Sequence, residues 1–466
     1  MNLTVLFLSR LQFAFTVSFH IIFPSFTIGL AAWLAVLEGL SLKTKKPVYR
    51  RLFEFWLKIF GVAFGLGVVS GIVLAFEMGL NWSRLSDFSG PIQGPLIVYE
   101  SFTAFALEAA FFGVLIYGRN RVSAGFYFFA TLMVCLGTTF SAFWIMVNNS
   151  WMQAPVGYEL VGGGFFPVDW AKIIFSPVVW VRFPHMLLAA YITGAFCVAS
   201  TGAWFQLRRF YAAEAQVMLR MGLGLAAVLV PIQLIFGHLN GDYVHDWQPA
   251  KFAAIEARWH DEQPAAEVLI AIPDAETESN HFELKIPYLG SLVAAMRLNS
   301  KEVGLTDFRR QDRPPVVIPF ITFRIMVGCG MAMLGIAWLG SYLLRKGAIE
   351  RSRLRLWVIF LGFPLPFIAT LTGWFTAEVG RQPWTVYGLL RTADSVTPSL
   401  SVGETIASLS FFAAIYVLIF SFGTIFIYRL LRAGPAGTGA VLPANAKRPL
   451  AVAGKAPIET VEGTTR

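Results

Sequence analysis

The chain has 466 residues, of which 56% are hydrophobic and 14% are charged, and its mean hydropathy is +0.62. These values exclude a soluble globular domain and indicate a polytopic membrane protein. The net charge of +9 is explained by membrane topology and by attraction to the anionic headgroups of the lipid bilayer, and it does not indicate nucleic-acid binding.

Nine apolar segments are long enough to cross about 30 Å of hydrocarbon. They lie near residues 14–40, 53–80, 94–118, 123–148, 182–207, 217–238, 317–343, 353–377 and 408–432. We therefore predict an all-α protein with nine transmembrane helices. The first segment is too long for a signal peptide and further apolar segments follow it, so we expect it to stay in the mature protein.

Lysine and arginine residues predict the orientation, because they are retained in short loops on the cytoplasmic side. Seventeen of these residues lie in or beside the connections after spans 1, 3, 5, 7 and 9, whereas five lie in or beside the opposite short loops. This bias predicts a periplasmic N-terminus and a cytoplasmic C-terminus.

The spans divide the chain into four segments. Residues 1–238 hold spans 1–6, residues 239–316 form a periplasmic loop, residues 317–432 hold spans 7–9, and residues 433–466 form a cytoplasmic tail. The charged and polar loop is more typical of a partly ordered functional segment than of a separate domain. The tail is rich in Ala, Gly and Pro, which predicts disorder.

Ionisable and sulfur-containing side chains gather toward the predicted outer ends of six different spans. They are His20, Glu77, Glu100, Glu108, His185, Arg324, Met326, Glu378 and Arg381. Ionisable residues within a membrane are costly and mark functional sites. The set therefore predicts one site beneath the long outer loop.

Several of these residues also have an ordinary structural explanation. A single His in an apolar helix is more often hydrogen-bonded to a carbonyl than bound to a metal, and Met326 could simply fill a gap in the packing. Glu378 and Arg381 are three residues apart and could form only an ion pair at a helix end. Their common depth on different helices favours a shared cofactor instead.

Haem is the cofactor that would use such a set, because imidazole and thioether groups bind haem iron axially. His20 and His185 lie well inside predicted spans, unlike the other four histidines. Two imidazoles, a thioether and a carboxylate could hold one six-coordinate haem and two five-coordinate haems. Glu100 and Glu108 lie two turns, or about 12 Å, apart on one helix, and could carry protons to an oxygen-binding face.

Three groups of motifs resemble those of subunit I of the cytochrome bd-type quinol oxidases. They are residues 380–384 (GRQPW) with Trp374 and Glu378, residues 141–144 (SAFW) with 149–153 (NSWMQ), and residues 323–328 (FRIMVG). The resemblance extends from residue 11 to about residue 432. It implies an α-helical membrane subunit that holds three haems.

By this resemblance, His185 and Met326 would be the axial ligands of a low-spin haem b, with Arg324 nearby to offset haem charge. His20 and Glu378 would hold two high-spin haems, one a haem b and the other a haem d or a second haem b. The resemblance does not decide which of His20 and Glu378 serves the oxygen-reactive haem.

The resemblance also implies roles for residues that do not ligate iron. Trp374 would lie between the high-spin haems, and Arg381 near their propionates. Glu100 and Glu108 match an acidic pair associated with haem binding and proton delivery. In the outer loop, Lys251 and Glu256 match the segment implicated in quinol oxidation, although from the residues alone they could be ordinary exposed charges.

The implied function is that of a terminal respiratory oxidase in the bacterial cytoplasmic (inner) membrane. Quinol would be oxidised on the periplasmic side, and oxygen would be reduced to water with protons from the cytoplasm, so that a proton motive force arises without a proton pump. The implied partners are a membrane-integral subunit II and a small single-span subunit. The short loop resembles family members without a C-terminal insertion; the cyanide-insensitive branch and the choice of ubiquinol or menaquinol stay open.

Two other classes of protein could also place ionisable residues in a membrane. A secondary transporter would show helices broken at the midplane, often with repeat symmetry, and the sequence indicates neither. A membrane anchor that passes electrons through haem b would more often pair two His per haem. Such an anchor gives no role to the motif around Glu378.

Overall fold

The computed structural model describes residues 4–349 and 352–435, so most of the predicted tail, 433–466, lies outside the described residues. Within that part of the chain, nine helical segments are long and apolar enough to cross a membrane, which confirms the nine predicted spans. The spans are formed by α1 Val5–Thr44, α2 Pro47–Leu80, α3 Ser83–Thr103 with η1 Ala104–Ala109 and α4 Ala110–Tyr117, α5 Ala124–Gln153, α7 Pro177–Arg208, α8 Ala212–Trp247, α11 Val317–Arg345, α12 Arg353–Leu361 with α13 Leu365–Val379, and α14 Val402–Ala433.

Two spans are interrupted, which the sequence did not predict. The third span contains the π-helical turn η1, and the eighth span breaks between α12 and α13. Pro364 and Pro366 lack the amide hydrogens that would continue the helix through this break. On α7, Ser200 Oγ donates to the Ile359 carbonyl oxygen at 2.9 Å, which satisfies one backbone group at the break.

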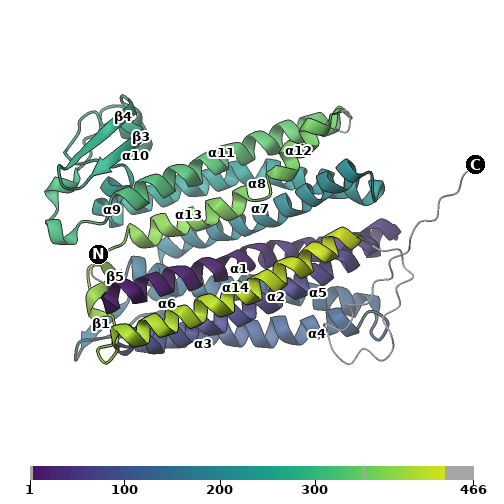
Figure 1. Ribbon diagram of the computed structural model, residues 1–466, viewed down its shortest axis with the longest axis horizontal. Helices are drawn as coiled ribbons and strands as arrows, with labels where there is room; N and C mark the ends of the chain where they lie inside the picture. The colour runs from purple at the N-terminus through teal and green to yellow at the C-terminus, as the bar shows by residue number, and fades with distance from the viewer. Residues whose placement is uncertain (1–3, 350–351, 436–466) are drawn as a thin grey trace, which may run out of the picture.

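The spans form two groups that meet along α1 and α7. Figure 1 shows α7, α8, α11, α12 and α13 on one side, which we call the α11 group. On the other side lie α1, α2, α3, α4, α5 and α14, which we call the α1 group. A Cβ added at Gly194 of α7 would lie 2.8 Å from the Gly29 carbonyl carbon of α1, so only glycine permits this close approach.

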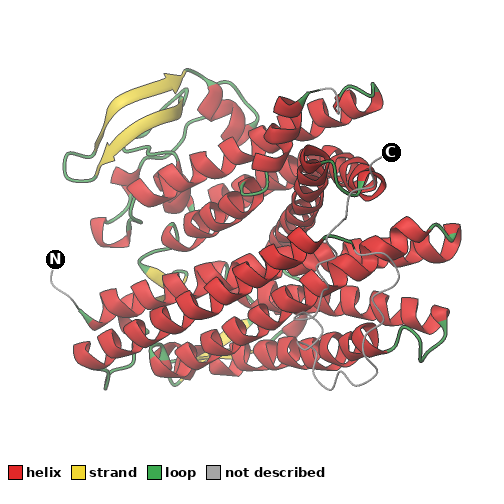
Figure 2. Ribbon diagram, turned by 45° about the vertical axis from the view of Figure 1, so that its right-hand side comes forward, coloured by secondary structure: helices red, strands yellow, loops and turns green. Residues whose placement is uncertain are grey.

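The outer loop folds over the end of the α11 group. It contains α9 Pro249–Ile255, a hairpin of β3 Glu267–Asp274 and β4 Ser279–Ile286, and α10 Leu289–Ala295, and the hairpin is visible in Figure 2. The strands are antiparallel, with Glu267 opposite Ile286. Helix α8 continues to Trp247, so the first residues of the predicted loop 239–316 are helical.

Two smaller hairpins lie at the same end of the bundle. The first pairs β1 Tyr158–Val161 with β2 Gly164–Pro167, and α6 Trp170–Ile174 follows it. The second pairs β5 Trp384–Val386 with β6 Leu390–Arg391. Together with the outer loop, these hairpins lie at the end of the bundle where α13 ends at Val379, one residue after Glu378. Glu108 lies nearer the other end, because the third span begins at Ser83 and ends at Tyr117.

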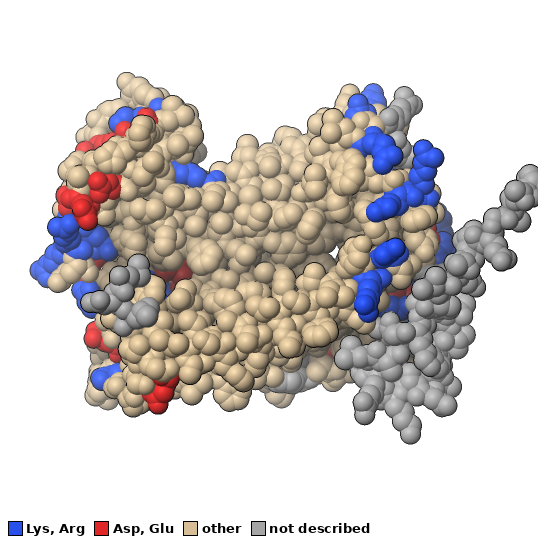
Figure 3. All heavy atoms as spheres, viewed as in Figure 1, with Lys and Arg blue, Asp and Glu red and all other residues tan. Residues whose placement is uncertain are grey.

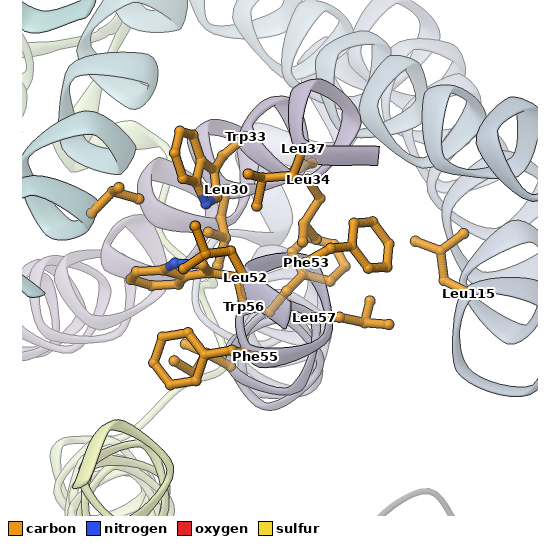
Figure 4. Packing of buried hydrophobic residues seen from close by; sticks show 14 of the residues in the cluster. Leu30, Trp33, Leu34, Leu37, Leu52, Phe53, Phe55, Trp56, Leu57 and Leu115 are labelled. Carbon is orange, nitrogen blue, oxygen red and sulfur yellow. The ribbon is translucent and has the colours of Figure 1, made fainter. Parts of the chain in front are cut away.

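The apolar core of the α1 group lies farther along the bundle. Figure 4 shows large side chains of α1 and α2 packed together, among them Leu30, Trp33, Leu34, Leu37, Leu52, Phe53, Phe55, Trp56 and Leu57. At the far end, Arg119 donates to both carboxylate oxygens of Glu38 at 2.6 and 2.8 Å. This ion pair holds the turn between α4 and α5 against α1.

Charged side chains are distributed unequally between the two ends of the molecule. Figure 3 shows Lys and Arg gathered at the end where α11 leads to α12, whereas the end with the outer loop exposes charges of both signs. This distribution agrees with the orientation expected from the sequence, which stays a prediction.

The close contact of α1 and α7 predicts a stability effect. We expect Gly194→Leu to lower the stability of the purified complex by about 1–3 kcal/mol, because the added side chain must push the helices apart. The control is Gly224→Leu, since a Cβ at Gly224 meets nothing within 4 Å. Equal thermal midpoints for the two variants would contradict this account.

Candidate functional site

Glu378 lies in the last turn of α13 at the centre of a buried polar cluster. Its Oε1 accepts hydrogen bonds from Asn149 Nδ2 at 3.0 Å and from Gln153 Nε2 at 3.2 Å, both on α5. Its Oε2 forms an ion pair with Arg381. The expected helix-end ion pair is therefore present. It is part of a larger network, in which Nε and Nη1 of Arg381 are buried without a hydrogen-bond partner.

Two further basic side chains reach this cluster from other elements. Arg182 of α7 donates from Nη2 to Asn149 Oδ1 at 2.6 Å. Lys251 of α9 is 3% exposed and donates from Nζ to Gln153 Oε1 at 3.2 Å. Burial, and then the charge of Arg182, lowers the pKa of Lys251 well below its usual range. Three basic side chains thus surround one carboxylate, which is an arrangement that suits an anionic ligand.

His185 and Met326 both lie in the α11 group. The His185 ring on α7 faces α8, where a Cβ at Gly237 would lie 3.5 Å from Cε1. Its Nδ1 is buried without a partner, and its Nε2 lies 3.4 Å from Gln233 Nε2. Met326 of α11 points at α13, where a Cβ at Gly373 would lie 2.7 Å from the Met326 sulfur. Both side chains therefore keep a donor atom for a metal.

His20 lies on α1, in the other group of helices. Its Nδ1 lies 2.9 Å from Ser70 Oγ on α2, and that hydroxyl donates its one proton to the Gly67 carbonyl oxygen at 3.0 Å. Ser70 must therefore accept from His20, which places the ring proton on Nδ1. The lone pair of Nε2 is left free for a metal, and the serine fixes the ring as outer-shell partners of metal-ligating His do.

Trp374 connects the helix of His20 with the helix of Glu378. It lies one turn before Glu378 on α13, and its ring centroid is 6.4 Å from that of Phe13 on α1. Phe13 in turn contacts Trp82 edge-on at 6.3 Å. The tryptophan therefore lies at the boundary of the two helix groups.

Glu100 and Glu108 face the same helix, α5. Glu100 Oε1 accepts from Ser141 Oγ at 2.8 Å, and the Glu108 side chain packs against Gly137, one turn away from Ser141. Glu108 lies within the π-helical turn η1 and is 6% exposed, and its Oε1 has no partner. π-Helical turns are frequent at functional sites. The position of Glu108 in such a turn therefore supports a functional role for this residue, and the sequence spacing did not reveal the turn.

Arg324 contacts the outer loop. Its Nη2 lies 3.1 Å from Glu256 Oε2, and its Nη1 donates to the Ile255 carbonyl oxygen at 2.6 Å. The guanidinium also lies over the Phe320 ring, with 3.8 Å between its carbon and the ring centroid. The structure therefore brings Glu256 to Arg324 and Lys251 to the Glu378 cluster, so the two predicted quinol residues belong to different polar networks.

Sequence reasoning missed several members of the site. Arg182 was counted only among the loop charges that set topology, yet an arginine one turn before His185 in an apolar helix was a signal of function. Asn149 and Gln153 were noted only as part of a motif. Their contacts with Glu378 join residues more than 200 positions apart, which no local pattern reveals.

The whole described membrane region is similar to known proteins. The sequence model of the family "Cytochrome bd terminal oxidase subunit I" matches residues 8–435. The chain is 34% identical over 443 residues to cytochrome bd ubiquinol oxidase subunit 1 of Bacillus subtilis (strain 168), with 92% of this chain and 93% of that protein covered. It is 31% identical over 504 residues to cytochrome bd-II ubiquinol oxidase subunit 1 of Escherichia coli (strain K12), with 92% and 97% covered.

A solved structure agrees with these sequence matches. The bd oxidase from Geobacillus thermodenitrificans contains a chain that superposes with a TM-score of 0.86 at 26% identity, over 93% of this chain and 99% of that one. The family model covers all nine predicted spans, because it extends from residue 8 to residue 435. The chain therefore belongs to the family of cytochrome bd terminal oxidase subunit I.

Proposed function

We propose that this chain is the haem-bearing subunit of a quinol:oxygen oxidoreductase in the bacterial inner membrane. It oxidises membrane quinol on the periplasmic side and takes part in the reduction of oxygen to water, which generates a proton motive force without proton pumping. The observation that carries this proposal is the buried set of Arg182, Lys251 and Arg381 around Glu378, together with two histidines, on α1 and α7, that keep free ring nitrogens.

The residues present fit haem, which combines an iron atom with two carboxylates. The unpartnered nitrogens of Arg381 supply donors for a carboxylate, Arg182 supplies further positive charge, and Lys251 adds a third basic group. His185 and Met326 would hold a low-spin haem b, and His20 and Glu378 would hold two high-spin haems. One of these is a haem b, and the other is a haem d or a second haem b.

When bound, haems supply one-electron transfer and oxygen chemistry. The chain itself supplies the electrostatic environment and the proton-carrying groups. Trp374, whose ring centroid lies 6.4 Å from that of Phe13 on α1, would lie between the two high-spin haems. Arg324, two residues before Met326, fixes the first turns of α11 to the loop and keeps a positive charge near this ligand.

Protons are handled at two places in the proposed mechanism. On the outer side, Glu256 accepts a quinol proton and Lys251 offsets negative charge on the quinol oxygen. On the oxygen-reducing side, Glu100 and Glu108 hold and pass protons along the interface of α3, η1 and α5. Because Lys251 and Glu378 both contact Gln153, the loop and the haem-binding cluster form one hydrogen-bonded unit.

Family membership removes both rival classes, the transporter and the electron-passing anchor. Subunits I of this family work with a second membrane subunit, so we propose subunit II as the partner, with a small single-span subunit in addition. Quinol and oxygen are the proposed substrates. We also propose a periplasmic N-terminus, which places the outer loop where quinol protons are released.

The proposed function predicts both haem content and activity of the purified complex. We expect a b-type band in the reduced-minus-oxidised spectrum, haem b in the pyridine haemochrome, and oxygen uptake that consumes two quinols per oxygen molecule. A far-red chlorin band would identify haem d as the third haem. A haem-loaded complex without quinol-driven oxygen uptake would refute the oxidase, and a complex without haem would refute the whole site.

The ligand assignment predicts a specific spectral change in Met326→Leu. Loss of the thioether leaves one axial ligand, so we expect the low-spin haem signal to become high-spin in electron paramagnetic resonance. Met331→Leu on the same helix is the control, because Met331 is 54% exposed. A low-spin signal that survives in Met326→Leu would exclude Met326 as a ligand.

A further inference from the structure

Arg324 binds a second carboxylate besides that of Glu256. Its Nη2 lies 3.1 Å from Glu256 Oε2 and 3.5 Å from Glu267 Oε1. Glu267 is the first residue of β3, and the mechanism proposed above gives it no role. The Glu256 side chain is 7% exposed and the Glu267 side chain 15% exposed. Glu256, at the end of α9, is thus the more deeply buried of the two side chains, and Glu267 is the more accessible to water.

Two carboxylates this close do not both stay ionised at neutral pH. Burial, then the negative charge of Glu256 and a hydrogen bond with its carboxyl group, raises the pKa of Glu267 to about 8. The positive charges of Arg324 on α11 and of Arg258 after α9 act in the opposite direction. Nearby, Glu262 accepts from the Ala266 amide at 3.1 Å and Lys285 pairs with Glu283, while Ile286, opposite Glu267 on β4, carries no charge. The pair therefore holds one proton at pH 7.

Anchoring of the loop does not require Glu267. Arg324 already donates from Nε to the Val268 carbonyl oxygen at 2.9 Å and from Nη1 to that of Ile255 at 2.6 Å, and it lies over the Phe320 ring. These contacts fix β3 and α9 to α11. A second, partly buried carboxylate costs desolvation and repulsion that anchoring alone does not repay.

We propose that Glu256 and Glu267 form one proton-accepting pair in quinol oxidation, in which Glu256 is the inner member and Glu267 delivers the proton to the outside. This inference rests on the proposed function. In each step, a quinol O–H bond breaks and the proton binds to the pair in its doubly ionised form. The proton moves across the hydrogen bond to Glu267 and leaves to water. Two such steps release both quinol protons, while both electrons pass on to oxygen reduction.

The pair gives the activity a characteristic pH dependence. The accepting form is doubly ionised, so its population rises as the pH increases through the pKa of Glu267, about 8. We therefore expect kcat/KM for quinol of the wild-type complex to rise with pH along a limb centred near pH 8. Rates are corrected for quinol autoxidation, measured without enzyme.

Glu267→Gln in the full complex tests the pair. We expect the ascending limb to disappear and kcat/KM above pH 8 to fall about tenfold or more, because the amide at this position can neither accept nor pass on a proton. Haem spectra should not change. Glu283→Gln is the matched control: it removes one carboxylate from the same hairpin, but Glu283 pairs with Lys285 at 3.0 Å and does not contact Arg324. Its profile should match that of the wild type.

The possible results separate this inference from the proposed function. A Glu267→Gln complex with the wild-type pH profile overturns the pair, as does an equal loss of rate at every pH. If the Glu267→Gln complex does not assemble, Glu267→Asp takes its place, because it retains a carboxyl group. Its kcat/KM should still rise with pH near pH 8, at a lower rate than in the wild type. A Glu267→Asp complex without this rise overturns the proposed pair. A wild-type complex without quinol-driven oxygen uptake refutes the oxidase itself.

Discussion

The burial of positive charge beside Glu378 is the constraint on which the rest of the site depends. An arginine or lysine removed from water at a membrane end must be compensated by an anion and by hydrogen bonds. Arg182, Lys251 and Arg381 come from α7, α9 and the turn after α13, and they share one carboxylate. The cluster therefore fixes the ends of these elements relative to α5 and leaves positive charge for the carboxylates of a haem.

The same constraint explains why the outer loop belongs to the membrane site. Helix α9 turns Lys251 toward Gln153 and the Glu378 cluster, while Glu256, at its end, meets Arg324 of α11. The loop is thus held by two polar contacts, one near each end of a short helix. In the proposed function, a quinol that binds against α9 would be close to both Glu256 and the Glu378 cluster, which would couple its oxidation to electron entry.

Much of the fold could be predicted from the sequence because a span of about 20 apolar residues is a local signal. The same signal predicted a common depth for His20, His185, Met326 and Glu378, which stays a prediction. The interruptions of spans 3 and 8 were missed because hydropathy does not record backbone hydrogen bonding. The partners of Arg324 and the role of Glu267 were missed because they arise only when the loop folds back on α11.

A redox titration of the haems in Arg182→Gln tests whether the buried positive charge beside Glu378 acts on a haem. Loss of a buried positive charge beside a haem stabilises the oxidised iron, so at least one midpoint potential should fall by about 60 mV or more, a tenfold change for a one-electron couple. Arg391→Gln is the control, because Arg391 lies at the same end, is 31% exposed and pairs with Asp312. Unchanged potentials in a fully haem-loaded Arg182→Gln complex would contradict the account.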